Sequence, residues 1–109
     1  MSLLGAIEAG GTKFVVAVAD VNDPDTVIAR ESFPTLDGAG TLAQVIAFFD
    51  QYEDIAAIGI AAFGPIDINP DSRTYGYVLD TPKRGWSGYD FLGAMKAWRD
   101  IPYFWTTDV

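Results

Sequence analysis

Apolar residues at the start of the chain form two short segments, residues 3–9 and 14–19, which flank the tight turn sequence of residues 10–13. Two short apolar segments separated by a glycine-rich turn predict a β-hairpin. Residues 20–25 are rich in Asp, Asn and Pro and predict a second turn, and residues 26–33 form a third predicted strand. The chain is therefore expected to open with three consecutive strands.

The pattern becomes helical after residue 40. Thr41, with Gln44 three residues later, has the spacing of a capping box, which predicts a helix that begins there. Apolar residues then recur at the spacing of one helix face and are expected in the core; they are Leu42, Val45, Ile46, Phe49 and Tyr52. Residues 55–62 are almost all apolar, which after a helix indicates a buried strand parallel to an earlier one.

The second half of the chain starts with a long connection, residues 66–88, which has weak strand character at residues 74–79. Asp90 is placed to cap a second helix over residues 91–99, and residues 103–107 form a last predicted strand. A meander followed by two right-handed crossovers predicts an α/β fold, in which helices pack on a mixed five-stranded sheet within one domain.

The composition of the chain excludes several classes of partner and of catalytic site. The 109 residues carry a net charge of −8, and the seven basic residues are scattered apart from Lys83 and Arg84. A nucleic-acid surface needs clustered Lys and Arg, so nucleic acid is not an expected partner. Without cysteine there are no disulfides or thiolate metal sites, and without histidine there is no Ser-His or Cys-His nucleophile. A catalytic base must then be a carboxylate, a lysine or a tyrosine.

The chain is predicted to be a soluble, cytoplasmic protein with no membrane partner. Half of its residues are hydrophobic, which predicts a folded core rather than disorder. No apolar run reaches the roughly 20 residues needed to span a bilayer, and residues 1–4 lack the features of a secretory leader.

The predicted hairpin turn is the first candidate for binding chemistry. Consecutive glycines, Gly10 and Gly11, supply the positive φ that such turns use and leave backbone N–H groups open to a ligand. Thr12 adds a hydroxyl and Lys13 a positive charge, so the turn suits a phosphate. The alternative is that the two glycines only turn the chain.

Three further places have both a structural and a functional interpretation. Gly64 and Pro65 end the strand predicted at 55–62, as a plain terminator or as a wall of a ligand site. Trp86, in a loop with hydrogen-bond donors, is placed either to hold a sugar face or to fill the core. Asp108 follows an apolar strand and is the best candidate for a general base, the alternative being an exposed terminal aspartate.

Asp20, Asp23 and Asp25 suggest a calcium loop. Their spacing lacks the glycine and the distal glutamate of an EF-hand, and Asn-Asp-Pro-Asp is ordinary turn sequence. A turn is the preferred interpretation.

Four segments together resemble a known family. IEAGGTK at residues 7–13 is similar to the first phosphate motif of the ROK family of bacterial sugar kinases, in the actin and sugar-kinase superfamily. FGPID at 63–67, TPKRGW at 81–86 and TDV at 107–109 resemble later landmarks of the fructokinase branch, in the family's order and at similar spacing. The resemblance covers nearly the whole chain.

The resemblance implies a ribonuclease H-like N-terminal lobe over residues 1–109 and ATP-dependent phosphorylation of a hexose, most simply fructose to fructose 6-phosphate, with ATP and Mg²⁺ as cofactors. The residues that would approach the ATP phosphates are Gly10, Gly11, Thr12 and Lys13. The residues that would line the sugar side are Gly64, Pro65, Thr81, Pro82, Gly85 and Trp86. Asp108 would be the base that takes the proton from the attacking sugar hydroxyl.

Two departures from the family pattern matter. Glu8 stands where many members have Asp, and the resemblance implies that it holds Mg²⁺ through water, on a side chain longer by a methylene. The family's zinc-binding cluster, second phosphate motif and adenosine pocket lie beyond Asp108. A structural Zn²⁺ and the homodimer implied for the full-length protein are therefore expected only with a C-terminal lobe. This chain is expected to be inactive alone and to expose an apolar face.

Two alternatives to the kinase stay open. Some ROK relatives are sugar-sensing repressors, but those carry a helix-turn-helix before the first hairpin, whereas this hairpin begins within a few residues of Met1. The other alternative is a non-catalytic nucleotide-binding module of the same superfamily, against which the sugar-side loop at 81–86 counts.

Overall fold

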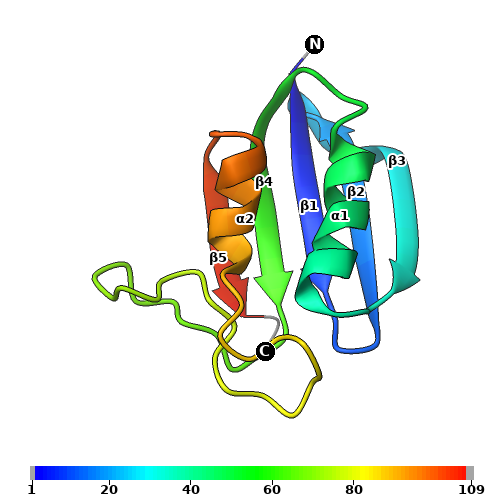
Figure 1. The fold of residues 1–109 in the computed structure, drawn as a ribbon. Helices are drawn as coiled ribbons and strands as arrows, with labels where there is room; N and C mark the ends of the chain where they lie inside the picture. The colour runs from blue at the N-terminus through cyan, green and yellow to red at the C-terminus, as the bar shows by residue number, and fades with distance from the viewer. Residues whose placement is uncertain (1, 108–109) are drawn as a thin grey trace.

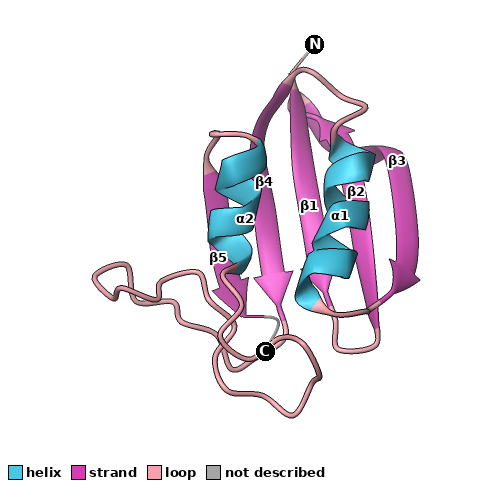
Figure 2. Cartoon of the chain, viewed as in Figure 1, coloured by secondary structure: helices cyan, strands magenta, loops and turns pink. Residues whose placement is uncertain are grey.

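Five strands and two helices make up the fold, which we describe from a computed structural model over residues 2–107. In chain order the elements are β1 (Leu3–Ala9), β2 (Lys13–Asp20), β3 (Asp23–Pro34), α1 (Gly38–Phe49), β4 (Ile55–Ala62), α2 (Phe91–Trp98) and β5 (Tyr103–Thr107). The strands form one sheet in the order β3-β2-β1-β4-β5 (Figures 1 and 2). This arrangement confirms the predicted α/β fold with a mixed five-stranded sheet.

The pairing of the central strand, β1, makes the sheet mixed. It is antiparallel to β2 and parallel to β4, and β5 extends the sheet parallel to β4. The first hairpin, the strand at 55–62 and the last strand are confirmed at their predicted places. Because β1, β4 and β5 run in the same direction, their carboxyl ends meet at one edge of the sheet, which we call the carboxyl edge.

The third strand starts earlier than predicted. β3 begins at Asp23, and only Val21 and Asn22 separate it from β2. The Asn-Asp-Pro-Asp sequence predicts a longer turn, but β3 is an edge strand of the sheet. A proline such as Pro24 is tolerated there, because the outer side of an edge strand needs no ladder hydrogen bonds.

The first helix also starts earlier than the capping box predicts. Its N-cap is Asp37, whose Oδ1 accepts a hydrogen bond from the Gly40 N–H at 2.9 Å. Thr41 lies inside the helix, fully buried, and its hydroxyl accepts from the Leu36 N–H at 2.9 Å. The first turn of α1 contains Gly38 and Gly40. Glycine has a low helix propensity, so the sequence pattern does not predict that the helix begins there.

Both helices cover the same face of the sheet (Figure 1). On α1 the predicted core residues Leu42, Val45 and Phe49 are buried, Phe48 joins them, and Tyr52 lies beyond the end of the helix. Among residues 2–107, no helix is long and apolar enough to cross a membrane.

The second helix is held at both ends. Asp90 caps its start as predicted, accepting from the Gly93 N–H at 2.8 Å. Near its end, the Tyr103 hydroxyl lies 2.9 Å from the Met95 carbonyl oxygen and 2.7 Å from that of Arg99, and it donates to one or the other. Burial raises the pKa of Tyr103 to about 12.

Tyr103→Phe is expected to lower the free energy of unfolding by about 1 kcal/mol at neutral pH, because one hydrogen bond is lost. The raised pKa means that the protonated hydroxyl stabilises the fold fully below its ordinary pKa of 10.0, and that this contribution is lost as the pH rises through about 12. Urea unfolding measures both effects. The difference in the free energy of unfolding between the wild type and Tyr103→Phe should become smaller from neutral pH to about pH 11. Tyr77→Phe is the control, because no hydrogen bond of the Tyr77 hydroxyl is found among the described residues. A difference that stays constant with pH would contradict the prediction.

The long connection between β4 and α2 contains no regular strand among its described residues. The strand predicted at 74–79 is present only as two single bridges, one between Ile66 and Val78 and one between Tyr77 and Asp90. Its backbone is therefore held by individual contacts rather than by a ladder.

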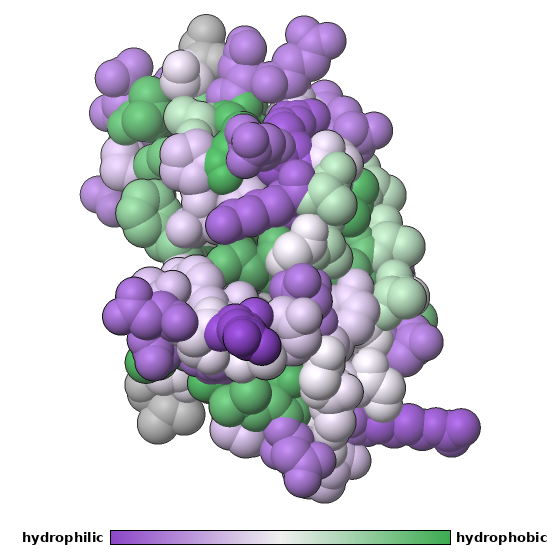
Figure 3. Space-filling model, turned by 60° about the vertical axis from the view of Figure 1, so that its left-hand side comes forward, coloured by the Kyte–Doolittle hydropathy of each residue, from purple (hydrophilic) through white to green (hydrophobic). Residues whose placement is uncertain are grey.

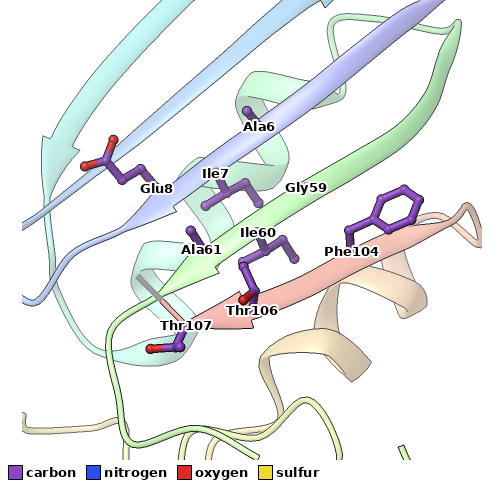
Figure 4. Close-up of a pocket in the computed structure, with 9 residues that line it drawn as sticks. All are labelled: Ala6, Ile7, Glu8, Gly59, Ile60, Ala61, Phe104, Thr106 and Thr107. Carbon is purple, nitrogen blue, oxygen red and sulfur yellow. The ribbon is translucent and has the colours of Figure 1, made fainter. Parts of the chain in front are cut away.

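No described element covers the opposite face of the sheet, which we call the open face. The strand register places small residues side by side on it, with Ala17, Ala6 and Gly59 next to Phe104 across β2, β1, β4 and β5. A shallow hollow of about 590 Å³ lies over β1, β4 and β5 (Figure 4), and Phe104 beside it is 68% exposed. Figure 3 shows the molecule from the β5 side, where hydrophobic residues lie between hydrophilic ones beside the edge of the sheet. Parallel strands are usually covered on both faces, so the open face is unusual for this architecture.

Candidate active site

Three predicted landmarks lie at the carboxyl edge of the sheet (Figure 1). The β1–β2 turn follows β1, Gly64 and Pro65 follow β4, and Thr107 ends β5. The Phe63 N–H donates to the Ala9 carbonyl oxygen at 2.8 Å, which ties the ends of β4 and β1 together directly before two of these segments. The fold thus brings together segments that are far apart in the sequence.

The β1–β2 turn is closed by a hydrogen bond from the Gly10 N–H to the Lys13 carbonyl oxygen at 3.0 Å. Neither Gly10 nor Gly11 has a positive φ, so that expectation is wrong. Gly10 is needed for space instead, because a Cβ there would lie 2.7 Å from the Lys13 carbonyl oxygen.

The tip of the turn is open to solvent. A Cβ at Gly11 would meet no atom within 4 Å, so a ligand could approach the backbone there. The side chains of Thr12 and Lys13 are exposed beside it. The turn therefore presents bare backbone, a hydroxyl and an ammonium group, which is the set of groups expected to bind a phosphate.

The loop at residues 81–88 lies against the start of α1. The Thr81 N–H donates to the Ser87 hydroxyl oxygen at 2.9 Å, and the Gly85 carbonyl oxygen accepts from the Gly38 N–H at 3.2 Å. Gly85 has φ +81°, and a Cβ there would lie 2.6 Å from the Asp37 Cβ, so only glycine fits. Pro82 is exposed between these anchors.

Trp86 fills the core instead of facing a ligand. Its side chain is fully buried, and its indole N–H donates to the Leu36 carbonyl oxygen at 2.7 Å. Its ring packs against Phe14 and Phe63, with centroids 5.7 and 5.4 Å away. The structure leaves no indole face for a sugar, so the expectation that Trp86 touches substrate is corrected to a packing role.

Asp67, just after the strand-end loop, is not among the residues that the sequence predicts for the site. Its carboxylate accepts hydrogen bonds from the Ser72 and Thr74 hydroxyls at 2.6 and 2.5 Å, and these bonds hold the pKa of Asp67 below its ordinary value. Its carbonyl oxygen accepts from the Trp105 indole N–H at 2.9 Å. Asp67 therefore joins the long connection to the middle of β5. In the sequence, Asp67 ends the FGPID segment and is followed by a run of short polar residues.

The predicted base, Asp108, lies outside the described residues, and its role stays a prediction. Thr107 before it pairs with Ala62 at the carboxyl edge. Glu8 is exposed and lines the same hollow as Thr107 (Figure 4). Within residues 2–107, no group of three or more Asp or Glu side chains is placed to hold a metal ion. A Mg²⁺ near Glu8 would thus depend on water and phosphate oxygens or on residues outside that range.

A model of the ROK family matches residues 4–109. The chain belongs to the ROK family. It is 46% identical over 108 residues to a fructokinase of Streptococcus mutans and 50% identical over 107 residues to a fructokinase of Pediococcus pentosaceus; each alignment covers 98% of this chain and 36% of the relative. The chain thus spans about a third of the length of these relatives.

The fold is also that of solved ROK structures. A ROK family glucokinase from Streptomyces griseus, in complex with glucose and AMPPNP, superimposes with a TM-score of 0.74 at 22% identity, covering 98% of this chain and 33% of that one. At this identity the likeness supports the fold alone. Family membership and this fold confirm the resemblance drawn from the four sequence segments.

Proposed function

We propose that this chain is the phosphate-binding lobe of an ATP-dependent hexose kinase that converts fructose to fructose 6-phosphate. The observation that carries the proposal is the meeting of the Gly10–Lys13 turn, the Gly64–Pro65 loop and the end of β5 at the carboxyl edge. Ligands of open α/β sheets bind at this edge. The two ROK relatives named fructokinase support the choice of sugar.

The turn is the phosphate side of the proposed site. Bare backbone at Gly11, the Thr12 hydroxyl and the Lys13 ammonium group are available to donate to phosphate oxygens. Bound Mg²⁺ would spread the charge of the transferring phosphoryl group, and Glu8 is the described carboxylate placed to hold it through water. Fixed donors at such a site lower the barrier by stabilising charge that develops in the transition state.

The sugar side would be formed by the loops around the carboxyl edge. Gly64 and Pro65 are exposed after β4, and the 81–88 loop is fixed against α1. The residues assigned to this side are Gly64, Pro65, Thr81, Pro82 and Gly85. Asp108, directly after β5, would take the proton from the sugar hydroxyl that attacks the γ-phosphate.

The proposed site is complete only with a second lobe. The chain spans about a third of its fructokinase relatives, so the adenosine pocket, the structural Zn²⁺ and the homodimer contacts are assigned to the remainder. Phosphoryl transfer needs both reactants held in one cleft. The chain alone is therefore expected to release no ADP from ATP and a sugar.

The phosphate role is tested with inorganic tripolyphosphate as the probe. Lys13→Ala is expected to weaken its binding roughly tenfold, because a charge-assisted hydrogen bond is lost. The dissociation constant is measured from the amide NMR shifts of the turn. Lys96→Ala, an exposed lysine on α2, is the matched control and should leave the constant unchanged. Equal effects of the two variants would contradict the phosphate role of the turn.

The open face is expected to make the chain associate with itself, since exposed apolar surface of this kind drives association. Phe104→Ser should reduce the apparent mass measured by light scattering at high protein concentration. Ile68→Ser is the control, because Ile68 is 55% exposed but lies in the long connection, away from the open face. A wild-type chain that stays strictly monomeric at high concentration would contradict the prediction.

A further inference from the structure

Thr35, directly after β3, forms two hydrogen bonds to the Gly10–Lys13 turn, which we call the phosphate turn. Its N–H donates to the Thr12 carbonyl oxygen at 2.9 Å, and its hydroxyl donates to the Gly10 carbonyl oxygen at 2.7 Å. These two bonds cross 23 and 25 residues of sequence, so they are tertiary contacts rather than part of the turn itself. Both bonds use carbonyl oxygens of the turn, so Thr35 occupies none of the turn's N–H groups. The position of the turn therefore depends on the position of Thr35.

The next residue, Leu36, holds the sugar-side loop. Its carbonyl oxygen accepts from the Trp86 indole N–H at 2.7 Å, and its N–H donates to the Thr41 hydroxyl oxygen at 2.9 Å. Two residues on, the Gly38 N–H donates to the Gly85 carbonyl oxygen at 3.2 Å. The segment between β3 and α1 is thus bonded to the phosphate turn on one side and to the 81–88 loop on the other.

The Trp86 indole also packs against the residue that follows the turn and against the residue that precedes Gly64. Phe14, which follows Lys13, stacks on Trp86 at 5.7 Å with an interplanar angle of 25°. Phe63, which precedes Gly64, meets the indole edge to face at 5.4 Å. These contacts surround a fully buried side chain whose N–H reaches the Leu36 carbonyl oxygen.

We propose that Thr35 and Trp86 are positioning residues, joined through Leu36, which fix the phosphate turn at one distance from the sugar-side loop. The inference rests on the proposed phosphate role of the Gly10–Lys13 turn. In-line phosphoryl transfer needs the two reactants aligned closely, and small displacements are costly. Neither residue needs to touch a substrate for this role.

The test follows the chain by NMR while tripolyphosphate is added. In the wild type, the amide signals of Gly11 and Thr12 and the indole signal of Trp86 are expected to shift along the same titration curve. The indole of Trp98, which donates to Asp50 at the C-cap of α1, should stay unshifted and serves as an internal control. Trp86→Phe identifies the Trp86 indole signal by its loss.

Thr35→Val removes the hydroxyl while keeping the shape of the side chain, and Thr35→Ser keeps the hydroxyl. In Thr35→Val the turn amides should still titrate while the Trp86 response is lost, and Thr35→Ser should restore it. A loss of fold alone would not produce this selective change. An indole response that persists in Thr35→Val would overturn the proposed role of the Thr35 hydroxyl and leave the Thr35 N–H bond to Thr12 and the packing of Phe14 as the connections.

Two other results are also decisive. If the amide signals of Gly11 and Thr12 titrate in the wild type while the Trp86 indole signal does not shift, the proposed coupling is overturned. The phosphate role of the turn is then retained. Turn amides that do not respond at all, in the wild type or in Thr35→Ser, would overturn the proposed phosphate role and the coupling with it.

Discussion

Trp86→Ala is expected to lower the free energy of unfolding by about 3–5 kcal/mol, the range for removing a buried Trp or Phe side chain. The indole is fully buried, contacts four aromatic rings, and satisfies the Leu36 carbonyl oxygen. The loss is a large share of the stability of an ordinary domain. Urea unfolding followed by circular dichroism measures it.

Two variants separate the causes of this loss. Trp86→Phe keeps a ring but removes the N–H, so it should cost less than Trp86→Ala. Trp98→Ala removes an indole that is partly exposed and stacks on the Arg99 guanidinium at 4.2 Å, so its cost should also be smaller. If Trp86→Ala costs no more than Trp98→Ala, the packing role assigned to Trp86 is wrong.

Asp108→Asn is expected to lower turnover by about 10²- to 10⁴-fold, the usual range for a general acid or base. The variant is made in a completed protein, in which this chain is joined to the remainder of the Streptococcus mutans fructokinase. Asparagine cannot take the proton of the sugar hydroxyl, but it keeps the size of the side chain. Fructose should still bind, which calorimetry measures beside ADP release.

Asp100→Asn is the matched control, because Asp100 is exposed and comes before β5 in the sequence, whereas Asp108 comes after it. Turnover unchanged by Asp108→Asn would remove Asp108 from the mechanism and favour a non-catalytic nucleotide-binding module. Loss of fructose binding together with turnover would make Asp108 a binding residue instead of a base.

The elements that sequence predicts well are those set by local pattern. The apolar runs at β1, β2, β4 and β5 predict strands because each run contributes buried apolar residues to the core. Asp90 predicts the start of α2, since a capping side chain acts within a few residues of its own position. The four family segments are short runs of consecutive residues, so the sequence alone is enough to show the resemblance to the ROK family.

The features that sequence does not predict depend on contacts between distant residues. Thr35 bonds to Gly10, 25 residues away, and Trp86 bonds to Leu36, 50 residues away. No local pattern distinguishes a tryptophan that fills a core from one that faces a sugar. The start of α1 was hidden for another reason, because Asp37 caps a glycine-rich turn that has low helix propensity.

ADP release by the completed protein tests the central claim most directly, with ATP, Mg²⁺ and a panel of fructose, glucose, mannose and N-acetylmannosamine. The account predicts turnover that is highest with fructose, and none from the 109-residue chain alone. Circular dichroism of both proteins shows that each is folded. A folded completed protein that is silent with every sugar, or a chain that turns over alone, would contradict the assignment of this chain as one lobe of a sugar kinase.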